Sequence, residues 1–225
     1  MSAVSAIGRP VKEQMSLPTG QQSLPGLCAI TQAVEILATK GGIEARGAIF
    51  TRREVVEFLL DLCGYSSDRP LHTLKLLEPS FGGGDFLLPA VERLLTAWKA
   101  AGKAQAPVKA LSGCICAVEL HRSTFEQTRA EVITLLSQNG IEASHAVELT
   151  DTWLINQDFL LADLPNVFDV VIGNPPYVRQ ERVPDVLLAE YRSRYTTIYD
   201  RADLYIPFIE RSLRSLTDGG VLGFI

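Results

Sequence analysis

The chain has 225 residues, of which 47% are hydrophobic and 21% are charged, as expected for a soluble globular protein with one ordinary domain. Its apolar runs are shorter than the roughly eighteen residues of a membrane-spanning helix, and its start lacks the pattern of a secretion signal. We therefore expect a cytoplasmic protein with no membrane partner. The net charge of −5 is not typical of a free-standing DNA-binding protein.

The first predicted elements precede the regular part of the chain. Residues 1–45 contain several prolines and glycines with little periodicity, so we expect a flexible lead-in with a short helix over residues 30–39. Apolar residues then recur at helical spacing over residues 52–62. Thr51 and Glu54 have the spacing of a helix N-cap and its partner at the start of this helix.

Strands and helices alternate in the main domain, which we place at residues 46–225. The predicted strands are residues 73–77, 113–118, 153–155, 168–173 and 221–225, and the predicted helices among them are residues 86–101, 122–138 and 202–216. This alternation predicts an α/β fold with a mostly parallel sheet and helices on both of its faces.

Four cysteines are present, namely Cys28, Cys63, Cys114 and Cys116. Alternation within the predicted strand would point Cys114 and Cys116 to one face, and no second cysteine or histidine pair completes a metal-binding spacing. We therefore favour reduced core thiols and predict no metal site.

A glycine-rich turn follows the first of these strands, within the sequence EPSFGGGDFL of residues 78–87. Three consecutive glycines permit positive φ angles and let a ligand approach the backbone. Two carboxylates beside the turn, Glu78 and Asp85, disfavour a phosphate and favour a cationic or hydroxyl-rich ligand. A plain tight turn is the alternative interpretation.

Acidic residues also follow the next two strands. Glu119 closes the second strand at a place where an acidic side chain can bind ribose hydroxyls. Asp158 and Phe159 follow the third, and they offer an acceptor and an aromatic edge suited to the amino group and ring of adenine. The alternatives are an exposed helix cap for Glu119 and an ordinary strand end for the other two residues.

The strand at residues 168–173 ends abruptly at Asn174-Pro175-Pro176-Tyr177. Neither proline can donate to a strand ladder, so the strand stops and presents Asn174 and Tyr177 at its carboxyl end, where ligands bind in open α/β sheets. A rigid amide, a proline carbonyl and an aromatic face together suit a planar base that carries an amino group. A core position for Tyr177 is the alternative.

All seven basic residues after Asn174 are arginines. Arginine suits bidentate phosphate contacts, so this stretch could face a nucleic-acid backbone, with Arg179 and Arg182 as the candidate DNA contacts. A solvated surface with paired charges is equally compatible with the composition, because acidic residues are interleaved. Five of the arginines lie close together: Arg179, Arg182, Arg192, Arg194 and Arg201.

These motifs together resemble those of a known enzyme family. Residues 78–87 resemble the S-adenosylmethionine motif Asp-Pro-x-Cys-Gly-x-Gly-x-Phe of amino-group DNA methyltransferases, and residues 174–177 match their catalytic motif. Within that group the chain is similar to the Eco57I-type adenine-specific methylases of restriction-modification systems. Residues 47–51 resemble the cofactor-binding segment before the glycine-rich turn, and residues 202–208 and 219–225 resemble later core motifs. Glu78 and Phe81 depart from the family's usual Asp and Cys.

The resemblance implies a Rossmann-like class I methyltransferase fold and transfer of a methyl group from S-adenosylmethionine to the N6 amino group of an adenine flipped out of double-stranded DNA. This activity corresponds to EC 2.1.1.72. It implies catalytic roles for Asn174, Pro175, Pro176 and Tyr177. The implied cofactor-binding residues are Phe50, Thr51, Glu78, Pro79, Ser80, Gly82, Gly84, Phe86, Leu87, Glu119, Asp158 and Phe159.

Several alternatives stay open. Protein-glutamine methyltransferases use the same four-residue motif, although Phe50 and Thr51 argue against them; an RNA amino-group methyltransferase and an inactive cofactor-binding fragment are the others. The sequence stops inside the apolar run of residues 221–225, so we expect missing C-terminal strands, a missing target-recognition region or partner subunit, and weak DNA binding. Chemistry alone does not separate adenine from cytosine, but Tyr177 and the resemblance favour adenine.

Overall fold

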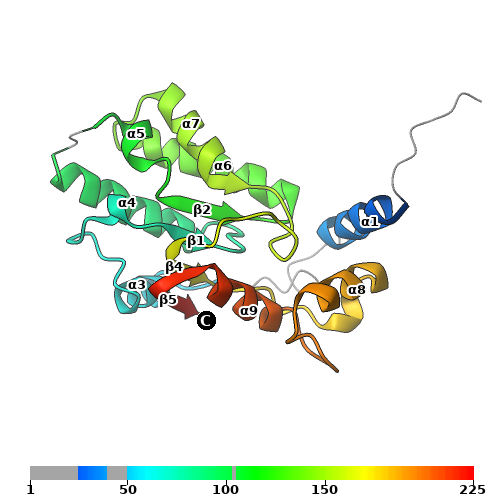
Figure 1. The fold of residues 1–225 in the computed structure, drawn as a ribbon. Coiled ribbons are helices and arrows are strands. Elements are labelled where there is room, and N and C mark those ends of the chain that lie inside the picture. Colours follow the sequence, from blue (N-terminus) through cyan, green and yellow to red (C-terminus); the bar gives the residue numbers. More distant parts are fainter. Residues whose placement is uncertain (1–24, 40–49, 103–104) are drawn as a thin grey trace, which may run out of the picture.

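The computed structural model describes residues 25–39, 50–102 and 105–225. In this part of the chain, helices cover both faces of a five-stranded sheet (Figure 1). The predicted α/β architecture is therefore confirmed. Residues 47–49 of the expected cofactor segment, the side chain of Cys28 and most of the expected lead-in lie outside the described residues.

The sheet has the strand order β3-β2-β1-β4-β5, and every pair of neighbours runs parallel. Its strands are β1 (Leu76–Glu78), β2 (Ile115–Val118), β3 (Leu154–Ile155), β4 (Phe168–Gly173) and β5 (Leu216–Phe224). The chain builds outward from β1 to β3 and then crosses to the other side of β1 with β4. Ligands bind in such sheets at this switch point, outside the carboxyl ends of β1 and β4.

Two hydrophobic cores flank the sheet, because consecutive strand residues point to opposite faces. In β1, Leu76 packs with residues of α3 to α7, whereas Leu77 packs with residues of α1, α8 and α9. The helices are α1 (Pro25–Thr39), α3 (Arg53–Leu62), α4 (Leu87–Ala100), α5 (Pro107–Leu111), α6 (Arg122–Gln138), α7 (Ala143–Trp153), α8 (Asp185–Arg194) and α9 (Tyr205–Ser215), with single turns η1 (Leu71–Thr73) and η2 (Gln180–Arg182).

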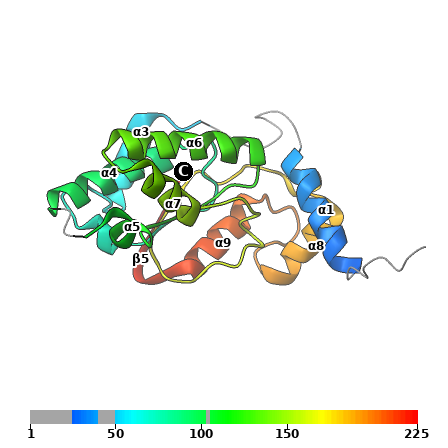
Figure 2. The same ribbon diagram turned by 90° about the horizontal axis from the view of Figure 1, so that it is seen from above.

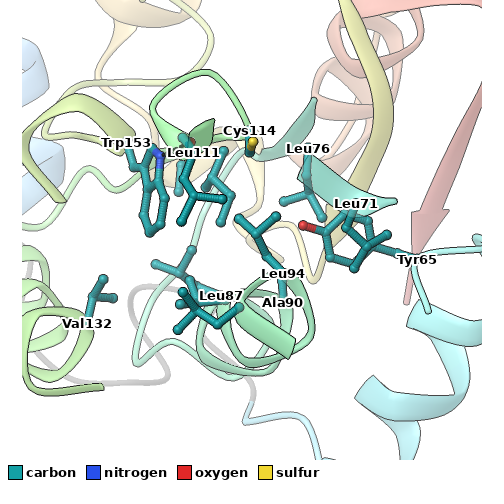
Figure 3. Packing of buried hydrophobic residues seen from close by; sticks show 14 of the residues in the cluster. Tyr65, Leu71, Leu76, Leu87, Ala90, Leu94, Leu111, Cys114, Val132 and Trp153 are labelled. Atoms are coloured by element: carbon teal, nitrogen blue, oxygen red, sulfur yellow. Dashed lines mark hydrogen bonds between the residues drawn. The ribbon is translucent and has the colours of Figure 1, made fainter. Parts of the chain in front are cut away.

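The core on the α4 side is built around large side chains without exposed surface (Figure 3). The indole of Trp153 is buried there and donates its Nε1–H to the backbone oxygen of Leu111 at 2.9 Å. This hydrogen bond satisfies the polar atom of the largest core residue, so α5 and α7 are joined by both packing and a buried donor.

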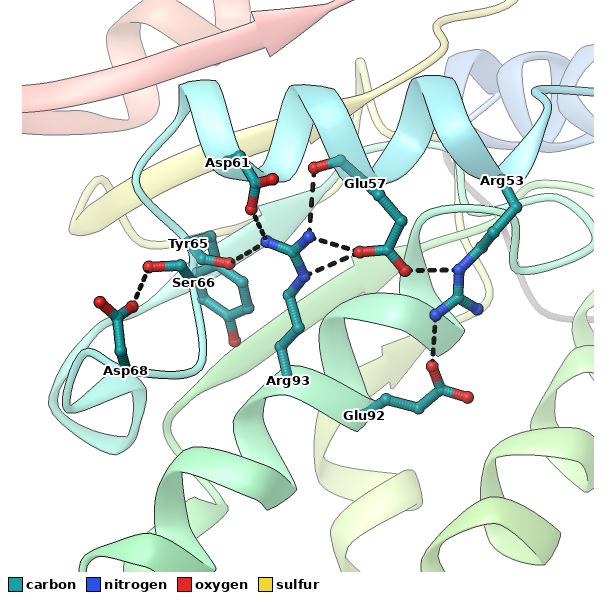
Figure 4. A network of polar contacts seen from close by, with 8 residues as sticks. All are labelled: Arg53, Glu57, Asp61, Tyr65, Ser66, Asp68, Glu92 and Arg93. Carbon is teal, nitrogen blue, oxygen red and sulfur yellow. Dashed lines mark hydrogen bonds and ion pairs between the residues drawn. The ribbon is translucent and has the colours of Figure 1, made fainter.

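A network of ion pairs fastens α3 to α4 (Figure 4). Arg93 contacts the carboxylates of Glu57 and Asp61 and donates to the backbone oxygen of Tyr65 at 2.9 Å. Partial burial of Glu57 acts to raise its pKa, but hydrogen bonds from Arg93 and Arg53 hold that pKa below its ordinary value. Because α3 begins two residues after Thr51, the network fixes a segment that borders the functional site.

Several local predictions are wrong. Thr51 is not the N-cap of α3; Arg52 occupies that position without a side-chain cap. Cys114 and Cys116 do not share a face, since Cys114 precedes β2 and belongs to the α4-side core whereas Cys116 packs against the other core. Among the described residues no group of three potential ligands could hold a metal ion.

Candidate active site

Residues that follow the carboxyl ends of β1, β2, β3 and β4 line one cavity of about 270 Å³. Nine of the predicted site residues line it: Phe50, Pro79, Ser80, Gly82, Glu119, Asp158, Phe159, Asn174 and Pro176. Others lie next to it without lining it. Phe86 and Leu87 are buried in the α4-side core beneath the glycine-rich turn, and Tyr177 lies at the surface with 42% exposure.

The glycine-rich turn is held in a conformation that requires glycine. Gly82 and Gly84 have φ angles of +48° and +84°, a region that side chains disfavour. A Cβ atom on Gly84 would lie 3.1 Å from atoms of both Leu88 and Thr128. The backbone N–H of Gly82 donates to Glu119 at 2.9 Å, and its carbonyl accepts the Thr128 hydroxyl at 2.7 Å. The turn is therefore fixed against the cavity wall.

Glu78, at the end of β1, is a buried carboxyl group with an unsatisfied oxygen. It is 1% exposed, and its Oε2 atom has no hydrogen-bond partner among the described residues. Burial raises its pKa well above the ordinary value, and the nearby charges of Asp85 and Glu119 add to the increase. A buried acceptor with this electrostatic environment fits a cationic ligand group, which would supply the missing partner.

The other two carboxylates are engaged by backbone amides. Asp85 accepts the N–H of Thr51 at 2.7 Å. Glu119 accepts the N–H groups of Gly82 and His121 at 2.9 and 2.7 Å. These bonds connect the start of α3, the glycine-rich turn and the end of β2 around one side of the cavity.

Asp158 and Phe159 form another part of the cavity wall. Asp158 is 7% exposed and accepts the N–H of Leu160 at 2.8 Å and the hydroxyl of Tyr191. The Phe159 ring lies 5.0 Å from that of Phe208, at an interplanar angle of 43°. This wall thus combines a buried acceptor with aromatic surface, which suits a flat heterocycle that carries a donor.

The motif after β4 is tied to three neighbouring segments. The side-chain amide of Asn174 donates to the Thr51 hydroxyl at 3.2 Å, and its backbone oxygen accepts the Ser80 hydroxyl at 3.3 Å. The Tyr177 hydroxyl donates to the backbone oxygen of Ile225 at 2.7 Å, and its ring lies 5.8 Å from that of Tyr205. Asn174 therefore faces the cavity while Tyr177 stays accessible from outside.

Sequence reasoning missed several residues of the cavity wall: Leu37, Leu120, His121, Thr124, Gln127, Gln157, Val178, Tyr191, Leu204 and Phe208. Leu37 belongs to α1, which lies beside α8 (Figures 1 and 2). His121 Nδ1 lies 2.7 Å from the backbone oxygen of Ala38. His121 could have been predicted as a cavity residue, because it lies only two residues after Glu119. No sequence pattern connects α1 with the cavity.

Six of the seven arginines after Asn174 are exposed, and Arg211 is half-buried. Arg192 and Arg194 are engaged by Gln180 and Glu190. Arg179 and Arg182 are exposed on the segment that follows the motif. These two side chains are consequently accessible to a partner near Tyr177.

Among solved structures, the fold is similar to the M protein of the type I restriction enzyme EcoKI, with a TM-score of 0.51, 14% sequence identity and coverage of 77% of this chain and 32% of that one. This likeness confirms the predicted Rossmann-like fold. The sequence model of the Eco57I restriction-modification methylase family matches residues 73–225, and the chain belongs to that family.

Two curated relatives support the same assignment. The chain is 61% identical to the type II methyltransferase M.PaeR7I of Pseudomonas aeruginosa, over 88% of this chain and 35% of the relative. It is 55% identical to M.XhoI of Xanthomonas vasicola, over 81% of this chain and 34% of the relative. The chain thus spans about a third of the length of these proteins. No helix in the part of the chain that the structure describes has the length and apolar character needed to cross a membrane.

Proposed function

We propose that this chain carries the cofactor pocket and catalytic motif of a restriction-modification DNA methyltransferase. In this proposal S-adenosylmethionine is the methyl donor and the N6 amino group of adenine is the acceptor. The observation that carries the proposal is the convergence of Glu119, Asp158 and Asn174, from the ends of three strands, around one cavity. Their spacing along the chain is large, so only the fold explains their proximity.

The residues around the cavity fit the cofactor. Glu78 would bind the methionine ammonium group, since it has a buried oxygen without a partner. Glu119 would bind the ribose hydroxyls with its remaining lone pairs. Asp158 and Phe159 would bind the adenine amino group and ring. Bound in this way, S-adenosylmethionine would supply an electrophilic methyl group on its sulfonium.

Asn174 would activate the acceptor by geometry and not as a base. The adenine amino group is a poor nucleophile because its lone pair is delocalised into the ring. Hydrogen bonds to the Asn174 side-chain oxygen and the Pro175 carbonyl would favour a pyramidal nitrogen whose lone pair points at the methyl group. Methyl transfer would form a nitrogen–carbon bond as the donor's carbon–sulfur bond breaks, and the extra amino proton would leave to solvent.

Adenine in a duplex would have to be flipped out to reach Asn174. Tyr177, at the exposed rim, would stack on the flipped base, while Arg179 and Arg182 would contact the DNA backbone. We assign target recognition to a further region or a partner subunit, because the relatives are about three times as long as the matched segment. We place this reaction in the cytoplasm, where the cell's DNA is modified.

Cofactor binding tests the proposal through its pH dependence. We expect saturable one-to-one binding of S-adenosylhomocysteine, with an affinity that falls as the pH decreases through the raised pKa of Glu78, because protonation removes the charge that binds the ammonium group. Glu78→Gln should weaken binding about tenfold at the upper end of the range and flatten the profile. Isothermal titration calorimetry at a series of pH values above the ordinary pKa of a glutamate carboxyl group measures both effects.

Glu148→Gln is the matched control, since this carboxyl group is exposed on α7 away from the cavity. Its affinity and pH profile should equal those of the wild type. A wild-type chain that is folded and binds no S-adenosylhomocysteine would refute the assignment of the cavity.

A further inference from the structure

Asp158 is held by a side chain from a distant part of the sequence. Tyr191, in α8, donates its hydroxyl to Asp158 Oδ2, while Leu160 N–H donates to Oδ1 at 2.8 Å. Both side chains line the cavity, and they are 7% and 1% exposed. The hydrogen bond between them is therefore buried in the wall of the cavity.

The contact leaves Asp158 able to accept further hydrogen bonds. A carboxylate offers about four lone-pair positions, and the two donors occupy one on each oxygen. Burial raises the pKa of Asp158, but the Tyr191 hydroxyl and the positive charges of Arg211 and Arg194 oppose that increase. The hydroxyl thus fixes the orientation of the carboxylate and favours its ionised, acceptor form.

We propose that Tyr191 is a positioning residue of the cofactor pocket: its hydroxyl orients Asp158 to accept a hydrogen bond from the exocyclic amino group of the cofactor's adenine. This inference rests on the proposed function. It makes α8 part of the cofactor site, although this helix follows the catalytic motif in the chain. The next residue, Arg192, donates to Gln180 at 3.1 Å, so consecutive residues of α8 contact the pocket wall and the segment after Tyr177.

A matched control lies four residues further along the chain, at the C-cap of α8. Tyr195 is also buried, and its hydroxyl donates to the backbone oxygen of Leu160 at 2.6 Å. Its ring does not line the cavity. Tyr195→Phe and Tyr191→Phe therefore remove the same group from neighbouring buried positions, but only Tyr191→Phe removes a hydrogen bond to Asp158.

The test is calorimetric titration with two ligands, S-adenosylhomocysteine and its analogue in which hydrogen replaces the adenine amino group. Tyr191→Phe should weaken S-adenosylhomocysteine binding about tenfold or more and leave the analogue's affinity within about twofold of wild type. Tyr195→Phe should leave both affinities within about twofold. Asp158→Asn, a second variant that retains the Tyr191 ring and hydroxyl, should show the same selective loss.

Thermal melting of each variant separates pocket effects from loss of folding. Equal binding of S-adenosylhomocysteine by wild type and Tyr191→Phe would overturn this inference and leave the proposed function intact. An equal loss of affinity for both ligands in Tyr191→Phe would have the same consequence. If the folded wild-type chain bound neither ligand, the proposed cofactor would be wrong and the inference would fall with it.

Discussion

Replacement of Asn174 by alanine should reduce methyl transfer by at least about a hundredfold, the usual order of magnitude for loss of one group that stabilises a transition state. The side chain faces the cavity, and its amide group donates a hydrogen bond to the Thr51 hydroxyl at 3.2 Å. It would contact the target amino group and not the cofactor's binding groups. S-adenosylhomocysteine affinity should therefore stay within about twofold of wild type.

The measurement is incorporation of tritiated methyl groups into DNA by the whole protein, combined with calorimetry of the same preparation. Asn174→Asp provides a comparison, because it retains an oxygen acceptor at nearly the same volume and should keep more activity than alanine. Transfer at the wild-type rate by Asn174→Ala would show that this residue is not catalytic.

Replacement of Tyr177 by alanine should weaken engagement of the flipped base by about 1–3 kcal/mol, the usual contribution of stacking between a base and an aromatic ring. The ring is 42% exposed and packs only partly against Tyr205, 5.8 Å away. Its face is therefore accessible at the rim of the cavity. Cofactor affinity should change little, because Tyr177 does not line the cavity.

Fluorescence of 2-aminopurine at the target position in DNA reports base engagement by the whole protein. Tyr177→Phe is the matched control: it keeps the ring and loses only the hydrogen bond to Ile225, so it should behave nearly as wild type. Tyr199→Ala removes a tyrosine with 77% exposure and controls for general surface effects. Equal signals from Tyr177→Ala and wild type would exclude stacking by this residue.

Features fixed by local chemistry could be predicted from the sequence. Two prolines after an apolar strand determine where β4 ends, and three glycines between β1 and α4 determine a turn with positive φ angles. Because the carboxyl ends of parallel strands meet at one edge of a sheet, Glu119, Asp158 and Asn174 could be expected to lie together. The structure brings these three residues to one cavity.

Features that depend on long-range contacts could not be predicted in this way. Thr51 has the local pattern of an N-cap, but its N–H bonds to Asp85, 34 residues later. Tyr191 carries no local sign of its contact with Asp158, 33 residues earlier. By contrast, α7 was missed although Ala146, Leu149 and Trp153 recur at helical spacing and are all buried, so its apolar face was visible in the sequence.

In the proposed function, the cavity and Asn174 together methylate the amino group of adenine in DNA. Mass spectrometry of nucleosides, after incubation of the whole protein with DNA and isotopically labelled S-adenosylmethionine, tests it most directly. We predict labelled N6-methyldeoxyadenosine that disappears with Asn174→Ala. Labelled N4-methyldeoxycytidine, or label recovered only in RNA or protein glutamine, would contradict the account.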